Sequence, residues 1–314
     1  MVEKINLTIV VPVYNSAFVL KKLAEEVLVS LEKNKITFEI IFVNDCSEDD
    51  SWKNILDLCK NYQWIKAIDL RKNFGQHNAI LAGLNYSNGE VIVLMDDDLQ
   101  HSPKDIVKIY SEIKNGNDVC YASFFERKHS FLKVLGSKLN NFFASFFLKK
   151  PLNLYLSPFK GFSDSIKNEI IKYKGSSVYI DGIILSLTKK ISSIKVQHYE
   201  SQRSFVKSNY TFFKLIKLWS QTIIGYSTIP LRIATFIGLV ASLISLLMVL
   251  IIILIKINNT QMPIGWASVI TSVLFIGGIQ LIALGIIGEY LSKVHYSINN
   301  NVQFSINKKI NFKK

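Results

Sequence analysis

Two long stretches without charge constrain the fold of this chain most strongly. Asp, Glu, Lys and Arg are absent from residues 233–255, a run of 23 residues, and from residues 257–288, a run of 32. A helix of about 20 residues, rising 1.5 Å per residue, crosses the roughly 30 Å core of a bilayer. Two apolar core helices of a soluble domain are the alternative, which runs of this length disfavour. We therefore expect a two-helix transmembrane hairpin over residues 232–291.

Basic residues beside these runs predict the orientation of the hairpin. Lys207, Lys214, Lys217 and Arg232 precede the first run and five lysines follow the second, whereas residues 258–265 contain none. By the positive-inside rule, both termini face the cytoplasm and the protein is a multi-pass protein of the inner (cytoplasmic) membrane. The start of the chain lacks a charged-then-apolar signal pattern, so residues 1–230 are expected to remain on the side of synthesis.

The charge balance and the cysteines add to this picture. Residues 1–231 contain 30 Lys and Arg against 23 Asp and Glu, a net charge of +7. Such an excess suits an anionic membrane surface or phosphate ligands. Nucleic acid is the rival partner, but the chain contains no recognised nucleic-acid-binding motif, so we expect none. Cys46, Cys59 and Cys120 are not paired by their spacing, as is typical of a reduced cytosol.

Strand and helix patterns alternate through the first part of the chain. Apolar runs rich in β-branched residues are typical of strands buried on both faces, and segments of about a dozen residues between them have helical periodicity. This alternation predicts right-handed βαβ units and a Rossmann-like, mainly parallel sheet in a cytoplasmic domain over residues 1–205. The expected strands are 6–13, 38–43, 64–70, 91–95 and 118–123, and the expected helices are 19–31, 48–61 and 77–86.

Three consecutive carboxylates, Asp96 to Asp98, follow the fourth expected strand. Without a counter-ion such charges repel one another, and carboxylate oxygens are ligands that divalent metals prefer. A solvated acidic turn before a helix is the alternative, because Ser102-Pro103 resembles a helix start. From the triplet alone the two interpretations remain equally open.

Two further strands are expected to end beside this triplet. Tyr14-Asn15 and Asn44-Asp45 each follow an expected strand, and the carboxyl ends of parallel strands share one edge of a sheet, where ligands bind. This convergence favours a metal and a phosphate-bearing substrate. The chain has neither a Gly-x-Gly-x-x-Gly sequence after its first strand nor a Walker-type loop, which disfavours a dinucleotide cofactor or ordinary nucleotide hydrolysis.

Two segments are rich in both aromatic residues and lysine. Residues 131–150 carry four lysines, no acid and phenylalanines at helical spacing, which indicates a helix lying in the membrane interface. A core helix with lysines at its exposed edge is the alternative. Residues 206–231 have the same character and are expected to form a juxtamembrane amphipathic helix. Residues 292–314 form a basic cytoplasmic tail, either poorly ordered or, from its alternating Ile and Phe residues, containing a short strand.

Several motifs resemble those of the family 2 glycosyltransferases, namely residues 9–15 (IVVPVYN), 43–45 (VND) and 95–100 (MDDDLQ). Residues 73–76 (NFGQ), 208–210 (SNY) and 227–232 (STIPLR) resemble the membrane-anchored polyprenyl-phosphate glycosyltransferases within that family. The resemblance covers residues 5 to about 293. It implies a GT-A fold, a nucleotide diphosphate-sugar donor, Mg²⁺ or Mn²⁺, and transfer of one sugar with inversion to a polyprenyl phosphate such as undecaprenyl phosphate.

The resemblance also implies roles for particular residues. Asp96, Asp98 and Gln100 would hold the metal and the diphosphate, with Asp98 counted as catalytic. Pro12, Tyr14, Asn15 and Asp45 would bind the nucleobase and ribose. The acceptor phosphate is ionised at pH 7 and needs cationic positioning more than a general base. The residues that match the family's acceptor side are Arg127 and Lys160 as catalytic groups, with Lys133, Ser137 and Arg203 as binding groups. For Arg127 and Arg203, a solvated surface charge is the alternative interpretation.

Some positions depart from the family pattern. Asn44 replaces an acid, and its amide is expected to contact ribose or base. The stretch 157–160 reads SPFK, so the Asp that precedes Phe-Arg in some members is absent and Lys160 replaces Arg. Transfer to another lipid-linked acceptor, and a catalytically idle nucleotide-sugar-binding scaffold, therefore remain alternatives. Small residues in the second apolar run favour helix packing in a homo-oligomer. Asp164 and Asp181 are expected to be a helix cap and a local structural contact.

Overall fold

The computed structural model of the protein describes residues 5–124, 151, 154–175, 178–197, 229–258, 265–298 and 302–312. The chain forms two compact units. The first contains Met1–Tyr210 together with Asn301–Lys314, and the second contains Thr211–Asn300. The end of the chain therefore belongs to the same unit as its beginning.

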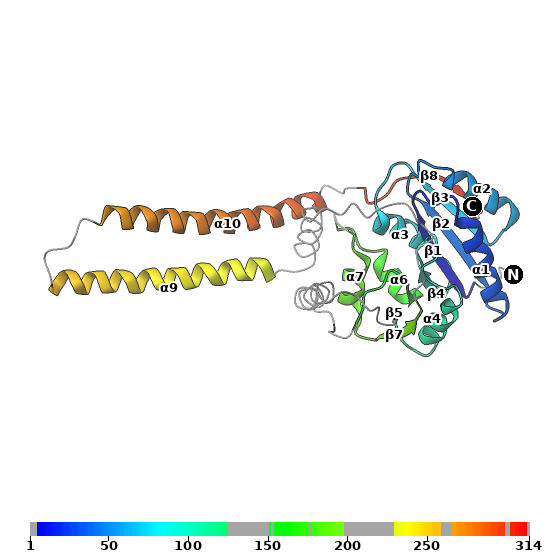
Figure 1. Ribbon diagram of the computed structural model, residues 1–314, viewed down its shortest axis with the longest axis horizontal. Helices are drawn as coiled ribbons and strands as arrows, with labels where there is room; N and C mark the ends of the chain where they lie inside the picture. The colour runs from blue at the N-terminus through cyan, green and yellow to red at the C-terminus, as the bar shows by residue number, and fades with distance from the viewer. Residues whose placement is uncertain are drawn as a thin grey trace. The chain divides into compact units, whose positions relative to one another are not determined.

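The first unit is an α/β structure whose elements are close to those expected from the sequence (Figure 1). Its strands are β1 (Leu7–Val13), β2 (Phe38–Asn44), β3 (Ile65–Leu70), β4 (Val91–Leu94), β5 (Val119–Phe124), β6 (Lys160–Ser163), β7 (Ile191–Val196) and β8 (Ile306–Ile310). Its helices are α1 (Leu20–Glu32), α2 (Ser51–Asn61), α3 (Gln76–Leu84), α4 (Asp105–Lys114), α6 (Asp164–Ile170) and α7 (Ile180–Leu187).

The strands of the described residues form one eight-stranded sheet with the order β7-β5-β6-β4-β1-β2-β3-β8. The central strands β4, β1, β2 and β3 are mutually parallel, as predicted. Strand β6 is antiparallel to both of its neighbours, and β8 is antiparallel to β3. The sheet is therefore mixed, which corrects the expectation of a mainly parallel sheet at its two sides. Neither β6 nor β7 was expected from the sequence.

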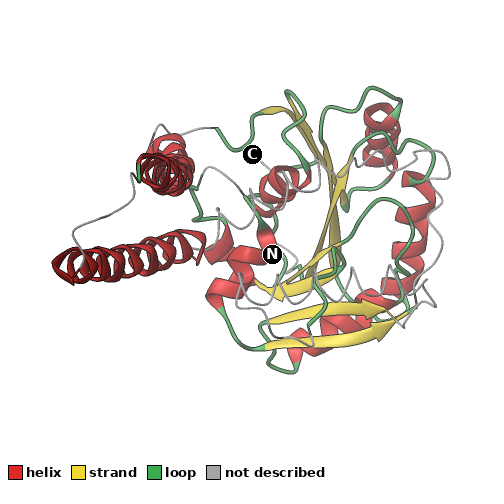
Figure 2. Cartoon of the chain, turned by 60° about the vertical axis from the view of Figure 1, so that its left-hand side comes forward, coloured by secondary structure: helices red, strands yellow, loops and turns green. Residues whose placement is uncertain are grey.

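Helices cover both faces of this sheet (Figure 2). Strand β1 is fully buried, with Leu7, Ile9 and Val11 all at 0% exposure in the core that α1, α2 and α4 complete. Helix α3 packs on β1, β2 and β3. Burial on both faces explains why the sequences of the central strands are mostly apolar instead of strictly alternating. A sheet held between helices presents its functional groups where the strands end.

The expected basic tail contains β8, so the alternative of a short strand holds. Ala67, Ile68 and Asp69 of β3 pair with Ile310, Lys309 and Lys308 of the tail. An unpaired edge strand exposes a row of backbone donors and acceptors, and β8 satisfies this row on β3.

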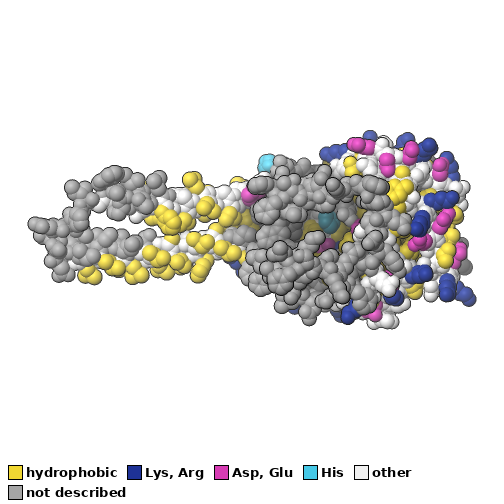
Figure 3. All heavy atoms as spheres, in the orientation of Figure 1, with side chains coloured by type: hydrophobic (Ala, Val, Ile, Leu, Met, Phe, Trp, Pro, Cys, Tyr) yellow, Lys and Arg dark blue, Asp and Glu magenta, His cyan; other side chains and the backbone are white. Residues whose placement is uncertain are grey.

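The part of the second unit that the structure describes consists of two long helices, α9 (Ile229–Asn258, 30 residues) and α10 (Trp266–Ile298, 33 residues), which pack side by side. Hydrophobic side chains are exposed along both helices (Figure 3), and Phe236 and Leu281 are 67% and 71% exposed. Among the described residues, only α10 has a window long and apolar enough to cross a membrane, Phe275–Ser292. In α9 the described apolar stretch is shorter, Leu231–Ala241, so the second span of the hairpin remains a prediction.

Two expected helices lie in parts of the chain that the structure does not describe. The interfacial helix at 131–150 is outside the described residues, as is the juxtamembrane helix at 206–231 except for residues 229–231. These last three residues already belong to α9, which begins before the expected boundary at residue 232.

Candidate active site

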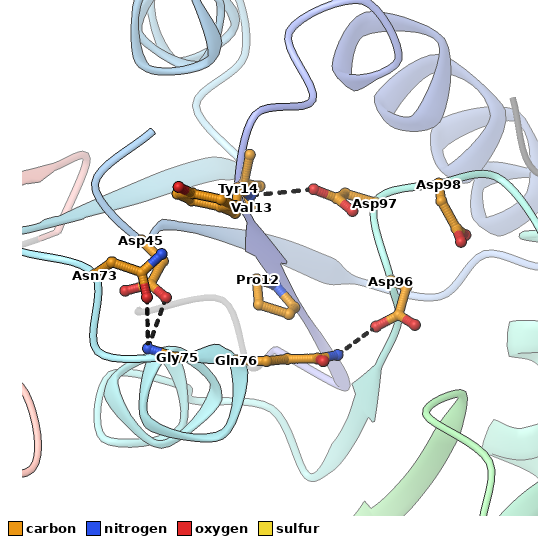
Figure 4. Close-up of a pocket in the computed structure, with 10 residues that line it drawn as sticks. All are labelled: Pro12, Val13, Tyr14, Asp45, Asn73, Gly75, Gln76, Asp96, Asp97 and Asp98. Atoms are coloured by element: carbon orange, nitrogen blue, oxygen red, sulfur yellow. Dashed lines mark hydrogen bonds between the residues drawn. The ribbon is translucent and has the colours of Figure 1, made fainter. Parts of the chain in front are cut away.

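A cavity of about 340 Å³ lies where β1 to β4 end. Figure 4 shows Asp45, Asn73 and Gly75 on one side of it and three aspartates on the other, with Pro12 and Gln76 between them. The residues that line the cavity are Pro12, Val13, Tyr14, Asp45, Asn73, Gly75, Gln76, Asp96, Asp97 and Asp98. Four strand ends therefore build this site, one more than the sequence suggested.

The three aspartates Asp96 to Asp98, named here the aspartate turn, follow the end of β4. Each carboxylate has a different partner. Asp96 accepts a hydrogen bond from the Gln76 side-chain amide (2.8 Å), and Asp97 accepts one from the Tyr14 backbone N–H (3.4 Å). Asp98 accepts one from the backbone N–H of Gln100 (3.0 Å). Asp97 is only 3% exposed. Because its hydrogen bond to Tyr14 joins the ends of β1 and β4, Asp97 does more than separate Asp96 from Asp98.

The chemistry of this turn suits a hard divalent cation. Its side chains offer only carboxylate oxygens, the ligands that Mg²⁺ and Mn²⁺ prefer. Within the described parts of the chain, no three His, Cys, Asp or Glu side chains converge to enclose a metal ion by themselves. Mg²⁺ is commonly held by one or two carboxylates, with substrate phosphates and water completing its shell. Asp96 and Asp98 fit that mode of binding.

The opposite wall of the cavity, formed by Asp45, Asn73 and Gly75 and named here the Asp45 wall, is held together by Asp45. Its two carboxylate oxygens accept hydrogen bonds from the backbone N–H groups of Phe74 (2.7 Å) and Gly75 (2.9 Å). Gly75 has a φ of 87°, a backbone conformation that side chains disfavour, and it leads directly into α3. Burial raises the pKa of Asp45, and the two N–H groups oppose that shift. Asp45 therefore lines the cavity while fixing the loop after β3 as part of the same wall.

Two neighbours of this wall differ in their contacts from what was expected. The side-chain amide of Asn44 donates a hydrogen bond to Asp69 (2.8 Å), and Asn44 is only 2% exposed. This amide is therefore directed into the protein and not towards a ribose or base, as had been expected. The Asn15 side chain accepts from the Glu48 backbone N–H (2.8 Å), and the Asn15 N–H donates to the Ser47 hydroxyl (3.1 Å). Asn15 thus joins the loops after β1 and β2 beside the cavity.

One protein family matches the part of the chain that builds this cavity. The model of the family described as glycosyl transferase family 2 matches residues 8–170, which run from β1 to α6 and contain every residue that lines the cavity. The chain is a family 2 glycosyltransferase.

Individual relatives narrow the group. An uncharacterized glycosyltransferase of Synechocystis sp. is 31% identical over 308 residues, which cover 94% of this chain and 92% of the relative. The undecaprenyl-phosphate 4-deoxy-4-formamido-L-arabinose transferase of Proteus mirabilis is 28% identical over 320 residues, with 99% and 96% covered. The chain is therefore similar to polyprenyl-phosphate glycosyltransferases over nearly its whole length, as its motifs predicted.

A solved structure supports the fold. Glucosyl-3-phosphoglycerate synthase of Mycobacterium tuberculosis, crystallised with Mn²⁺, uridine diphosphate and phosphoglyceric acid, superimposes with a TM-score of 0.52 at 13% identity. The match covers 70% of this chain and 76% of that one. At this identity the likeness concerns the fold alone, and it confirms the GT-A fold of the first unit.

A second cavity of this glycosyltransferase, of about 200 Å³, shares Pro12, Gln76 and Asp96 with the first. Lys160, at the start of β6, lines it and is only 3% exposed. Its ammonium group forms an ion pair with Asp181, which also accepts a hydrogen bond from the Tyr121 hydroxyl (2.8 Å). Lys160 is therefore a neutralised, buried cation instead of a freely accessible one. Asp181, expected to be a local structural contact, is its counter-ion.

Removing that counter-ion is expected to destabilise the fold. Asp181→Asn leaves Lys160 charged and buried, and breaking a buried ion pair in this way costs about 3–5 kcal/mol of the free energy of unfolding. Urea denaturation of the purified full chain measures this loss. The double variant Lys160→Met/Asp181→Asn removes the unpaired cation and should recover most of it. Equal stability of the single and double variants would contradict the assigned ion pair.

His77, which also lines the second cavity, predicts a pH dependence. Its ring meets that of Tyr179 edge-on at 5.2 Å, and its Nδ1 atom is buried. Burial lowers the pKa of His77 from 6.5 to about 4, and the charge of Lys160 adds to that shift. The unfolded chain takes up a proton near pH 6.5 that the folded chain resists, so stability should fall as the pH drops from 6.5 towards 4. Thermal melting across this range should show a smaller decline for His77→Phe than for the unsubstituted chain, and identical curves would contradict the assignment.

The structure thus brings together five of the expected site residues in one cavity: Pro12, Tyr14, Asp45, Asp96 and Asp98. Asn15 and Gln100 lie beside it, and Lys160 lines the adjoining cavity. The remaining expected residues, Arg127, Lys133, Ser137 and Arg203, lie outside the described part of the chain. Asn73, Gly75 and Gln76 also line the cavity, although the sequence assigned their motif only to the family resemblance and not to the site. The signal that identifies this motif is its position directly after the third expected strand, whose end lies at the same edge of the sheet as the other strand ends.

Proposed function

We propose that this glycosyltransferase moves a single sugar, with inversion, from a nucleotide diphosphate-sugar to a polyprenyl phosphate at the cytoplasmic face of the membrane. We favour a UDP-sugar as donor and undecaprenyl phosphate as acceptor, with the product serving cell-envelope polysaccharide or glycoconjugate modification. The observation that carries this proposal is the cavity in which the Asp45 wall faces the aspartate turn. The acceptor is proposed from the printed activity of the Proteus mirabilis relative.

Within this proposal, nucleobase and ribose bind near Pro12, Tyr14 and the Asp45 wall, and the diphosphate lies towards the aspartate turn. Asp96 and Asp98 are the residues that would hold Mg²⁺ or Mn²⁺, with Gln100 assisting. The bound cation would neutralise the negative charge that develops on the diphosphate leaving group. The hydrogen bond from Gln76 to Asp96 keeps this carboxylate directed along the cavity wall.

The donor sugar would occupy the second cavity. Its volume of about 200 Å³ and its three residues in common with the first cavity support this assignment. The paired Lys160 and Asp181 would orient sugar hydroxyls, since a buried polar pair discriminates strongly between hydroxyl patterns. In the reaction an acceptor phosphate oxygen bonds to the anomeric carbon, whose bond to the diphosphate oxygen breaks, and the nucleoside diphosphate leaves. Arg127, Lys133, Ser137 and Arg203 are proposed to position the acceptor phosphate.

We also propose that α9 and α10 form the two-span hairpin that holds the catalytic unit at the cytoplasmic leaflet. Both uncharged runs of the sequence support this arrangement, as do the exposed apolar side chains of α10. At Gly277, Gly278, Gly285 and Gly288, no described atom beyond the chain neighbours and the backbone of the same helix lies within 4 Å of where a Cβ would be. Such open small-residue surfaces favour helix packing in a homo-oligomer.

One assay tests the proposed function. The purified full chain is incubated with undecaprenyl phosphate, Mg²⁺ or Mn²⁺, and a panel of labelled UDP- and GDP-sugars. A chloroform-extractable labelled product is expected with one donor, and chelation with EDTA should abolish its formation. Nucleotide binding without product from any donor would overturn the proposal in favour of a non-catalytic scaffold.

A further inference from the structure

The segment formed by residues 302–312, named here the C-terminal strap, belongs to the first unit and is anchored to the rest of that unit near both of its ends. Near its start, the side-chain amide of Gln303 donates to the carbonyl oxygens of Tyr173 (3.1 Å) and Gly175 (3.0 Å). Near its end, the amide of Asn311 donates to those of Cys59 and Ile65, both at 2.8 Å. Strand β8 lies between these anchors.

One contact of the strap leads towards the active site. The Asn307 amide donates to Asp69 Oδ2 (2.7 Å), and Asp69 Oδ1 accepts from the Asn44 amide (2.8 Å). Asp69 is only 8% exposed, so its carboxylate depends on these two donors. The register of β8 shifts at this point, since Asp69 pairs with Lys308 and Leu70 with Ile306. A shift of this kind redirects the skipped side chain, here that of Asn307.

A second contact of the strap reaches the start of the loop after β3. The carbonyl oxygen of Ser305 accepts a hydrogen bond from the Arg71 backbone N–H (2.9 Å). Arg71 is the first residue after β3 and begins the loop that continues to Asn73 and Gly75. Asn44, reached through Asp69, immediately precedes Asp45, whose carboxylate holds the same loop. The strap thus braces both parts of the Asp45 wall.

We propose that the C-terminal strap sets the geometry of the nucleotide-binding wall, with Asn307 as a positioning residue for the donor. The inference rests on the proposed function in so far as this wall binds a nucleoside diphosphate. The strap follows α10 after only residues 299–301. Donor binding is therefore coupled to a segment that directly follows the candidate membrane helix, more than 200 residues beyond the wall itself.

The alternative role for the strap is that of a simple edge cover. A strand that only shields β3 acts through its backbone groups, so its effect would not depend on the side chains at positions 307 and 69. The hydrogen-bonded series Asn307–Asp69–Asn44 predicts something more specific, because its effect should depend on which charges and donors occupy positions 307 and 69.

A charge exchange separates the two roles. Asn307→Asp places a second carboxylate against Asp69, and like charges at this distance repel. In the double variant Asp69→Asn/Asn307→Asp, the amide at position 69 accepts from Asn44 and donates to the carboxylate at position 307, so both hydrogen bonds are retained. Ser305→Ala is the matched control, because it keeps the backbone carbonyl that Arg71 uses.

Two measurements on the full-length chain in detergent decide the result. Calorimetry with UDP and with GDP, each with Mn²⁺, should give a Kd about 5-fold higher for Asn307→Asp, the effect of roughly one net hydrogen bond. Hydrogen exchange at the Phe74 and Gly75 amides, the donors to Asp45, should be faster in the same variant. The double variant should restore both values to within about 2-fold, and Ser305→Ala should change neither. Should Asn307→Asp fail to fold, Asn307→Ala removes the donor without adding charge and should give a smaller shift in the same direction.

The outcomes distinguish this inference from the proposed function. If the unsubstituted chain binds neither UDP nor GDP, the proposed donor class fails, and hydrogen exchange alone decides the role of the strap. If the unsubstituted chain binds a nucleotide while Asn307→Asp changes neither measurement, the positioning role is wrong. Equal effects of Ser305→Ala and Asn307→Asp, or failure of the double variant to restore either value, would likewise overturn it in favour of an edge cover.

Discussion

Replacing Asp98 by asparagine is expected to lower sugar transfer by at least about 100-fold. The substitution keeps the size of the side chain and an oxygen that can accept from the Gln100 N–H, so the turn itself should persist. What it removes is one negative charge from a site proposed to hold a divalent cation. A cation at a leaving group contributes several kcal/mol to transition-state stabilisation, and each 1.4 kcal/mol is about tenfold in rate. Transfer of labelled sugar to undecaprenyl phosphate measures the effect.

The control for this experiment is Asp57→Asn. Asp57 is an exposed carboxylate on α2 that pairs with Lys60, so its loss changes the net charge equally without touching the cavity. Activity should stay within about 2-fold of the unsubstituted chain, because exposed ion pairs contribute little. Membrane insertion and thermal melting of both variants should be unchanged. Near-normal turnover by Asp98→Asn would remove Asp98 from the proposed metal site.

Replacing Asp45 by alanine is expected to have the second large effect, through the shape of the nucleotide wall. The carboxylate accepts two hydrogen bonds from the loop after β3, and hydrogen bonds to a charged group contribute about 1.5–3 kcal/mol each. Without them the Phe74 and Gly75 N–H groups lose their partner, and the loop carrying Asn73 loses its anchor. The Kd for UDP or GDP with Mn²⁺ should rise by more than about 10-fold.

A graded series tests this explanation. Asp45→Asn keeps one acceptor oxygen and should lie between Asp45→Ala and the unsubstituted chain in both nucleotide affinity and hydrogen exchange at Gly75. Asp57→Ala again serves as the exposed control. If Asp45→Ala binds nucleotide as tightly as the unsubstituted chain, the Asp45 wall is not the nucleotide-binding surface.

The strands that could be predicted are those whose burial is written in their own sequence. Strands β1, β2 and β4 are mostly apolar on both faces because both of their faces are covered. Strand β6 is different, since its sequence KGFS has neither an apolar run nor alternation. It becomes a strand by insertion between β4 and β5, where a Cβ on Gly161 would lie 2.3 Å from Ile109 Cγ2. Glycine is therefore needed at position 161 because α4, which is distant in the sequence, packs closely against it. The local sequence pattern does not predict this contact.

The candidate site divides in the same way. Asp96, Asp98, Tyr14 and Asp45 could be identified because each directly follows a predictable strand, and parallel strands end at one edge. The partner of Lys160 could not, because nothing in the sequence relates it to Asp181. A buried cation needs a counter-ion within reach, and only the packing of α7 against β6 provides it.

By itself, the sequence determined that this chain has a βαβ domain with acidic residues at its strand ends. It also determined that the chain has uncharged runs long enough to cross a membrane as helices. These features follow from local composition, because burial on both faces, helical length and strand ends are all properties of single segments. Only the tertiary structure decided that Lys160 is paired, that Asp45 holds the loop after β3, and that the strap returns to β3. Each of these depends on groups distant in the sequence that satisfy one another's charge or hydrogen bonds, and such pairs exist only once the chain has folded.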